Sequence, residues 1–443
     1  MTLKKKNFFI LILVIFEILY FKEFLFRPYN TPGQESLISF FAHQAAMSNW
    51  VRLDHNIFVT KILECDGSLV FFNEVSNWPN GFFYLFSFII KFFGNLEIVG
   101  RSFAIFLNLS GMYLFVKYSC KQNEEYFLLF SIPIVLASPI GLSSINVVYP
   151  DSMLILLISL LNISISNFIF YSLCIFLTPL FYHIVFFYNF THLIYLHFRK
   201  LISINQFIYL SIFLIFTLFY LIYVLSVNEN GFEFKKLIDK FLVRSFYPNL
   251  VEFESSQHEV GENVNFYHRT YMFYSLIKDN LSIFIFPFLF LGLKNELQNR
   301  TLLSFFYVST VIINYIFLQY FIVHYYSNLI FVFLSIILSL IGLNVFLKYF
   351  ELQKYNLLVF TLILLSNITI INKDLIYQKW DPVIEDSNSF RNFLSTSLDK
   401  KANKFVLQNY SSDKRICGFY LLPTIIENYN QKDKIQYIDL NLY

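Results

Sequence analysis

Long apolar runs with almost no charge recur along the chain, and they limit what it can fold into. Runs such as 206–226 and 327–347 reach the roughly 20 residues that a helix needs to cross a hydrocarbon core about 30 Å thick. Only 14% of the residues are charged, about half the share usual in soluble domains. The sequence therefore excludes a soluble globule and a disordered chain, and it predicts an all-α polytopic membrane protein.

About eleven membrane helices are expected. The candidate spans are 8–26, 99–117, 124–143, 151–167, 168–182, 184–198, 206–226, 282–294, 301–321, 327–347 and 356–372. The apolar stretch 80–94 is short and carries Lys91, so we expect it to lie against the membrane without crossing. We expect 168–198 to be a hairpin that is broken near Thr178-Pro179.

The orientation follows from short loops rich in Lys and Arg, which stay in the cytoplasm. Lys4 to Lys6 precede the first apolar run, which lacks a small-residue cleavage site and is predicted to be a retained span. This orientation places the N-terminus in the cytoplasm. We expect the membrane to be the plasma (inner) membrane of a bacterium. Three long polar regions then fall on the outer face, where we expect the chemistry: 27–98, 227–281 and 373–443.

Two domains are predicted. Residues 1–372 form the transmembrane domain with its outer loops 27–98 and 227–281, and residues 373–443 form a small α/β domain outside the membrane. Its apolar-alternating runs, such as 436–439, are typical of strands that bracket a helix near 388–398. Cys65 and Cys417 both fall on the oxidising side, and a bridge between them is a hypothesis.

Two carboxylates in the first outer loop flank structure that is expected at the membrane surface. Glu35 opens the amphipathic piece from Ser36 to Met47, and Glu74 precedes Trp78-Pro79 and a second amphipathic stretch. The simpler interpretation is a pair of interfacial helices whose aromatic side chains face lipid. The functional interpretation is that the carboxylates act on a substrate at the membrane surface.

The order of residues in this region resembles the opening block of the GT-C glycosyltransferases, in particular the aminoarabinose transferases of lipid A and the protein mannosyltransferases. The residues that carry this resemblance are Gln34-Glu35, Asn49-Trp50, Phe72-Asn73-Glu74, Trp78-Pro79, Lys91-Phe92-Phe93-Gly94 and Arg101. Further matches are Tyr149-Pro150-Asp151, Tyr267-His268-Arg269 and His324-Tyr325-Tyr326. Two positions depart from the family pattern, because Gln34 replaces the leading Asp of an acidic pair and Leu177-Thr178-Pro179 replaces Lys-Gly-Pro.

The resemblance implies transfer of a sugar from a polyprenyl-phosphate donor to a hydroxyl or phosphate acceptor at the outer face. A base must deprotonate the acceptor, and Glu35 is our choice for it, with Asp54 as the local alternative. Arg52 and Arg269 would stabilise the departing lipid phosphate. Tyr325 belongs to the motif at the membrane edge and would contact substrate.

Asp151 stands at a membrane boundary, where an unpaired carboxylate is expensive. It is predicted to be paired or to be placed to orient the acceptor, and the simpler interpretation is that it caps the helix that it begins.

Metal binding is a further implication of the resemblance, since a Glu and two His at matching places hold a metal ion in the aminoarabinose branch. The corresponding residues are Glu74, His268 and His324, whose side chains are suitable zinc ligands. The simpler interpretation is histidines hydrogen-bonded to backbone or lipid phosphate. His43, His55 and His258 match no motif and are expected at the surface, while His192 and His197 are expected to be interfacial anchors. No nucleotide cofactor is expected.

The expected partners are the lipid-linked sugar donor, membrane lipid and an acceptor of unknown identity. The net charge of +3 and the lack of a basic stripe argue against nucleic acid. Two other functions stay open: a ligase or polymerase of the O-antigen type, and a transporter or flippase of lipid-linked intermediates. A transporter predicts essential charged residues near the middle of the membrane, and the apolar runs contain almost none.

Overall fold

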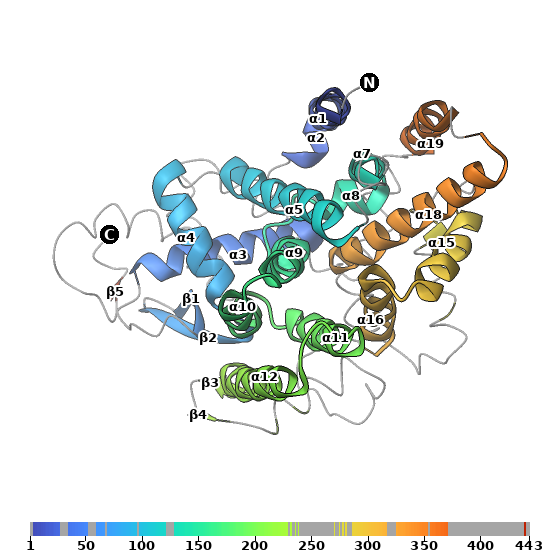
Figure 1. Ribbon diagram of the computed structural model, residues 1–443. Coiled ribbons are helices and arrows are strands. Elements are labelled where there is room, and N and C mark those ends of the chain that lie inside the picture. Colours follow the sequence, from blue (N-terminus) through green and yellow to red (C-terminus); the bar gives the residue numbers. More distant parts are fainter. Residues whose placement is uncertain are drawn as a thin grey trace.

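The computed structural model shows a mostly helical protein (Figure 1). The residues that it describes are 3–26, 34–51, 59–66, 69–94, 97–120, 128–228, 231–232, 286–316, 325–352, 355–370 and 438–439, with single positions between 235 and 280. The α-helices, apart from the short α2, α7 and α8 described below, are α1 (Leu3–Tyr20), α3 (Gln34–Val51), α4 (Gly81–Phe93), α5 (Glu97–Ser119), α9 (Leu154–Ser164), α10 (Phe168–Phe181), α11 (Val185–Phe198), α12 (Ile204–Ser226), α15 (Phe286–Gln298), α16 (Leu302–Ile316), α18 (Leu329–Tyr349) and α19 (Asn356–Ile370).

Three of these helices are long and apolar enough to cross a membrane, and they indicate an integral membrane protein. They are Glu97–Ser119, Ile204–Val224 and Leu329–Tyr349. Shorter apolar helices occur at four of the eight other predicted spans, 8–26, 151–167, 168–182 and 301–321, and at the stretch 80–94. The predicted helical class is thus confirmed, while the side of the membrane on which each loop lies stays a prediction.

The helix α18 forms the centre of the fold. It runs between α7 and α8 on one side and α15 and α16 on the other (Figure 1). Every residue from Leu329 to Asn344 is buried. A helix that is apolar all round requires this position, because no face of it suits water.

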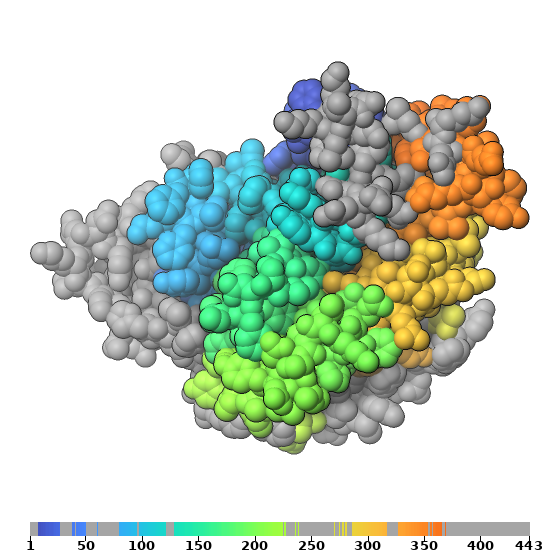
Figure 2. Space-filling model, viewed as in Figure 1, coloured from blue at the N-terminus to red at the C-terminus, as the bar shows by residue number. Residues whose placement is uncertain are grey.

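Other helices leave their apolar side chains uncovered. On α12, Ile208, Ile212 and Phe219 are about half exposed or more, and Figure 2 shows this light green helix at the outside of the molecule. Phe8, Leu11 and Phe16 are similarly exposed on α1. Apolar surface of this extent is unfavourable in water and favourable against lipid tails, which supports the membrane assignment.

The predicted span 124–143 is wrong as one continuous helix. The structure places two short buried helices there, α7 (Ser131–Leu136) and α8 (Pro139–Ser144). Ser138 between them is extended, and its side chain accepts a hydrogen bond from the Gly141 N–H at 3.1 Å. A Ser cap followed by Pro starts a new helix, because Pro cannot donate to the preceding turn.

The hairpin predicted over 168–198 is confirmed. The helix α10 continues through Pro179 to Phe181, and α11 begins at Val185. The break comes at Tyr182, whose backbone is extended, three residues beyond Pro179 of the expected Thr178-Pro179. This extended residue belongs to the site described below.

The predicted outer loop 27–98 contains a β-hairpin as well as the expected helices α3 and α4. Strand β1 (Val59–Asp66) pairs antiparallel with β2 (Leu69–Pro79), and the short strand β5 (Ile438–Asp439) pairs with β2. Strands β3 (Val227–Asn228) and β4 (Gly231–Phe232) form a second small pair. The rest of the predicted α/β tail, and Cys417 of the proposed bridge, lie outside the described residues.

Candidate functional site

The Asp151 carboxylate accepts a hydrogen bond from a distant segment of the chain. Tyr149 is extended, and Pro150 opens a 3₁₀ turn, η2 (Pro150–Met153), that leads directly into α9. The Tyr182 hydroxyl donates a 2.7 Å hydrogen bond to Oδ1 of Asp151. Asp151 therefore lies inside the first helical turn and is bound by a side chain from the α10–α11 break. The structure thus gives Asp151 a hydrogen-bond partner, while its role toward an acceptor stays a prediction.

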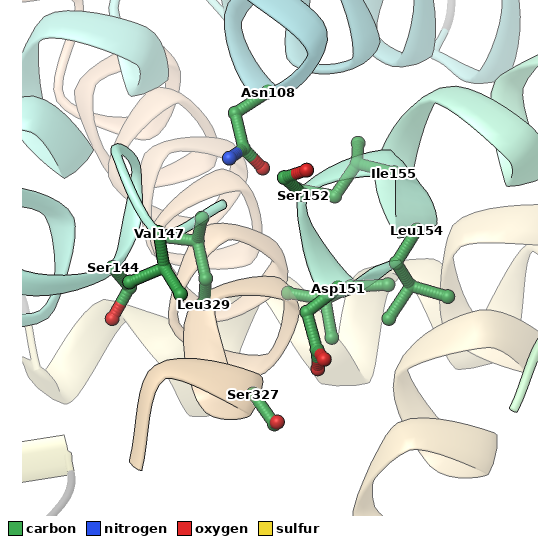
Figure 3. Close-up of a pocket in the computed structure, with 10 residues that line it drawn as sticks. Asn108, Ser144, Val147, Asp151, Ser152, Leu154, Ile155, Ser327 and Leu329 are labelled. Atoms are coloured by element: carbon green, nitrogen blue, oxygen red, sulfur yellow. The ribbon is translucent and has the colours of Figure 1, made fainter. Parts of the chain in front are cut away.

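A small cavity lies beside this carboxylate. Its volume is about 10 Å³, and it is partly open to the surroundings. The side chains that line it come from α5, α8, the η2–α9 segment and the segment that opens α18: Asn108, Ser144, Val147, Asp151, Ser152, Leu154, Ile155, Ser327, Leu329 and Ile330. Figure 3 shows Asp151 and Ser327 near one another at one end, with Asn108 and Ser152 at the other.

Ser327 reaches the cavity in the same way as Asp151 does. It stands in a 3₁₀ turn, η4 (Tyr325–Asn328), that leads directly into α18. Its hydroxyl lies within interaction range of the Asp151 carboxylate without meeting hydrogen-bond geometry. Two helix starts that are far apart in the sequence thus face one cavity, each through a polar side chain.

A buried hydrogen-bond network fixes the segment that precedes Asp151. Arg101 of α5 is fully buried, and its Nη1 donates to Ser39 Oγ and to the Asn146 carbonyl, both at 3.1 Å. Asn146 Nδ2 donates to the carbonyls of Phe24 at 3.0 Å and of Leu25 at 2.8 Å, where the short helix α2 (Lys22–Leu25) ends. A buried guanidinium with such partners is stable only in one arrangement, so the network positions its neighbours.

The same network places the start of α3. Val148 N–H donates to Ser39 Oγ at 3.0 Å, three residues before Asp151. Glu35 lies four residues before Ser39 on the same helix, which is a rise of about 6 Å. Ser39, one helical turn from Glu35, is thereby held beside Val148, three residues before Asp151.

The other predicted site residues are placed only in part. Glu35 is the second residue of α3, Glu74 is in β2 and Tyr325 opens η4, with their backbones described. Arg52, Asp54, His268, Arg269 and His324 lie outside the described residues. The structure therefore brings Asp151 together with the segment after Tyr325 and with the helix of Glu35, and it leaves the rest of the predicted site as a prediction.

The zinc site stays a prediction as well. Across the part of the chain that the structure describes, no three His, Cys, Asp or Glu side chains gather as metal ligands would. Two members of the predicted set, His268 and His324, are outside that part.

Sequence reasoning missed Tyr182, Ser327 and the role of Arg101. Ser327 directly follows the His324-Tyr325-Tyr326 motif, and Tyr182 directly precedes His183 near the expected hairpin break. An uncharged Tyr or Ser among so many apolar residues gives no signal in the sequence. Arg101 did give a signal in the sequence, because a lone cation inside an apolar run needs hydrogen-bond acceptors from neighbouring segments.

Two histidine predictions are wrong. His43 is buried on α3 with its ring edge against Phe86, at 5.2 Å between centroids, so it is no surface group. His192 is fully buried, with its Nδ1 at 2.9 Å from the Tyr171 hydroxyl and its ring stacked on Phe306. Helical periodicity turns both rings toward neighbouring helices instead of the interface.

Comparison of the sequence and the structure with known proteins finds no matching protein-family model, no matching curated protein and no matching solved structure. The resemblance to GT-C glycosyltransferases therefore stays a prediction from the sequence motifs.

Proposed function

We propose that this membrane protein is a glycosyltransferase that moves a sugar from a polyprenyl-phosphate donor to an acceptor at the outer face. The observation that carries the proposal is the meeting of distant segments at one buried carboxylate and its cavity. Asp151 follows Tyr149-Pro150, Tyr182 at the α10–α11 break donates to the Asp151 carboxylate, and Ser327, which follows Tyr325-Tyr326, lines the same cavity. Segments separated by up to 176 positions in sequence supply these groups, as an enzyme site requires.

Asp151 is the described group best suited to accept a proton. Its Oδ1 is bound by Tyr182, while its Oδ2 is buried and has no hydrogen-bond partner among the described residues. A general base must be held in place by one contact and keep a free lone pair for the proton that it takes. In this proposal Asp151 shares the role of base with Glu35, which the sequence motifs indicate.

The remaining roles follow the sequence prediction. Arg52 and Arg269 would stabilise the departing polyprenyl phosphate, since guanidinium groups bind phosphate with paired hydrogen bonds. Asp54 and Tyr325 would contact substrate. Glu74, His268 and His324 would hold a divalent metal ion such as zinc, which would add positive charge near the leaving phosphate.

Glu17 favours a second candidate function, a transporter or flippase of lipid-linked intermediates. It lies on α1, it is 1% exposed, and neither carboxylate oxygen has a hydrogen-bond partner among the described residues. A transporter is expected to have charged residues inside its spans, and this buried carboxylate is one of the few in the apolar runs.

A reconstitution experiment tests the proposal. Purified protein in phosphatidylcholine liposomes is supplied with polyprenyl-phosphate sugars extracted from bacterial membranes and with a mixture of lipid acceptors. Release of polyprenyl phosphate and formation of a glycosylated lipid are measured for wild type, Glu35→Gln and Glu17→Gln. We expect transfer by wild type, a loss in Glu35→Gln if it shares the base role, and unchanged transfer in Glu17→Gln.

Movement of labelled donor lipid across the same liposomes without any sugar transfer would contradict the proposal. If Glu17→Gln then stopped that movement, the transporter would be the better account. Loss of transfer in Glu17→Gln alone, with the protein still folded, would also move the reactive carboxylate away from the cavity.

A further inference from the structure

The cavity contains buried polar atoms that lack partners. Asp151 Oδ2, Ser327 Oγ and Asn108 Oδ1 are all buried, and none has a hydrogen-bond partner among the described residues. All three residues line the same cavity (Figure 3). Ser327 is 3% exposed and Asn108 is 0% exposed. Buried polar groups are nearly always satisfied, so this cluster is suited to a bound group that supplies hydrogen bonds.

Size limits what that group can be. The free volume of about 10 Å³ is close to the roughly 10–15 Å³ that one water molecule needs. A sugar ring or a phosphate is several times larger, while a water molecule or the hydroxyl end of a larger molecule fits. The partly open side allows the rest of such a molecule to remain outside the cavity.

Charge limits it further. Among the described lining residues Asp151 is charged, and no Lys or Arg accompanies it. The starts of α9 and α18 are positive ends of helix dipoles, and Asp151 already complements the first of them. An anion would meet the carboxylate without a compensating cation, whereas a neutral hydroxyl can donate to Oδ2 and accept from the Ser327 hydroxyl.

We propose that this cavity is the subsite for the attacking oxygen of the acceptor, and that this oxygen belongs to a neutral hydroxyl and not to a phosphate. The inference rests on the proposed function. The hydroxyl oxygen forms the new bond to C1 of the sugar, the bond between C1 and the phosphate oxygen breaks with its electron pair leaving on polyprenyl phosphate, and the hydroxyl proton passes to Asp151 Oδ2. Ser327 is a positioning residue that directs the hydroxyl lone pair.

The test offers the two acceptor chemistries separately. Wild-type protein in phosphatidylcholine liposomes receives the extracted polyprenyl-phosphate sugars and either a glucosyl diacylglycerol, which has hydroxyls, or phosphatidic acid, which has only phosphate. Mass spectrometry identifies the glycosylated lipid, and polyprenyl phosphate release reports donor cleavage independently. We expect sugar on the glucosyl lipid, or free sugar from attack by water, and no sugar on phosphatidic acid.

Ser327→Ala is the variant and Ser339→Ala is its matched control. Ser339 is buried on α18, where its hydroxyl donates to the Ser335 carbonyl, and it is not among the residues that line the cavity. Loss of a hydrogen bond to a reacting group corresponds to about a tenfold or larger fall in rate. We expect this fall in Ser327→Ala at unchanged KM for the donor, and wild-type rates in Ser339→Ala.

Three results would overturn the inference. Sugar on phosphatidic acid would show an anionic acceptor, and a wild-type rate in Ser327→Ala would show that the cavity does not hold the attacking oxygen. A fall in the transfer rate when choline replaces sodium in the buffer would assign the cavity to a cation. Absence of any donor cleavage would instead reject the proposed function itself, and the inference with it.

Discussion

The Tyr182 hydroxyl fixes the orientation of the Asp151 carboxylate. Its side chain is fully buried, and its hydrogen bond to Asp151 Oδ1 is 2.7 Å long. A bond of this kind to an ionised group contributes about 1.5–3 kcal/mol. Without it, both carboxylate oxygens would be free to rotate and to bind other donors, so the geometry of proton transfer would be lost.

Tyr182→Phe is therefore expected to lower sugar transfer about tenfold while the protein stays folded. The matched control is Tyr188→Phe, which removes a 2.9 Å bond between the Tyr188 and Thr310 hydroxyls elsewhere in the bundle. Initial rates in liposomes and thermal unfolding in detergent distinguish the two effects. Equal losses of rate in both variants would show that Tyr182 acts through general stability.

At the residue scale, the sequence revealed charged groups better than neutral ones. Asp151 was predicted as a site residue because an unpaired carboxylate at the start of an apolar run is energetically unfavourable. Tyr182 and Ser327 could not be predicted, since the chain holds 31 tyrosines and many serines without any mark that separates these two. Only the meeting of the α10–α11 break with the turns that precede α9 and α18 selects them.

At the scale of elements, apolar run length predicted most of the helices because each run must satisfy its own backbone in lipid. The span 124–143 failed because one Ser-Pro pair changes the direction of the chain without changing its hydropathy. The β-hairpin was also missed. Its signal is present, since Gly67-Ser68 joins two apolar-alternating stretches, a pattern typical of a two-residue turn.

The contact between α15 and α18 depends on two glycines. A Cβ atom on Gly342 would lie 2.0 Å from the Phe288 carbonyl oxygen, and one on Gly292 would lie 1.9 Å from the Leu338 carbonyl oxygen. Small residues let helix backbones approach in this way inside membranes. Gly342→Ala is thus expected to destabilise the protein by about 1–3 kcal/mol despite the better helix propensity of Ala.

Thermal unfolding in detergent measures the effect, with Ser339→Ala on the same helix as the control. A melting temperature for Gly342→Ala equal to that of wild type would show that α15 and α18 can move apart without loss of stability.

At the end of α11, by contrast, a substitution by glycine is expected to increase the stability of the protein. Lys200 has a φ of 55°, and Leu201 N–H donates to the Leu196 carbonyl, as in a helix end that favours glycine. Lys200→Gly is expected to raise the free energy of unfolding by up to about 1 kcal/mol. Arg199→Gly is matched in charge and exposure, but its φ is −82°, so it should destabilise. The prediction fails if denaturation in detergent shows both variants shifted in the same direction.

At the scale of the whole molecule, the uncovered apolar faces and the buried α18 fit a bundle in lipid. The helix α12 spans 23 residues, or roughly 35 Å, which exceeds a hydrocarbon core of about 30 Å. Its start follows Arg199 and Lys200, so the predicted orientation places Ser203 in the cytoplasm and Asn228 outside.

Labelling with a membrane-impermeant maleimide tests this orientation in intact cells. In a background without the four native cysteines, Asn228→Cys is expected to react and Ser203→Cys to stay unlabelled until the cells are opened. Labelling of both positions, or of Ser203→Cys alone, would reverse the assignment of the outer face.

Asp151→Asn in the reconstituted transfer assay tests the central claim most directly. The amide keeps the size of the side chain and removes the proton acceptor, and loss of a general base costs about 10²–10⁴-fold in rate. Glu351→Gln, an exposed carboxylate just after α18, is the control. We expect sugar transfer to fall by at least a hundredfold in Asp151→Asn and to stay at the wild-type rate in Glu351→Gln. Wild-type transfer by a folded Asp151→Asn protein would contradict the account.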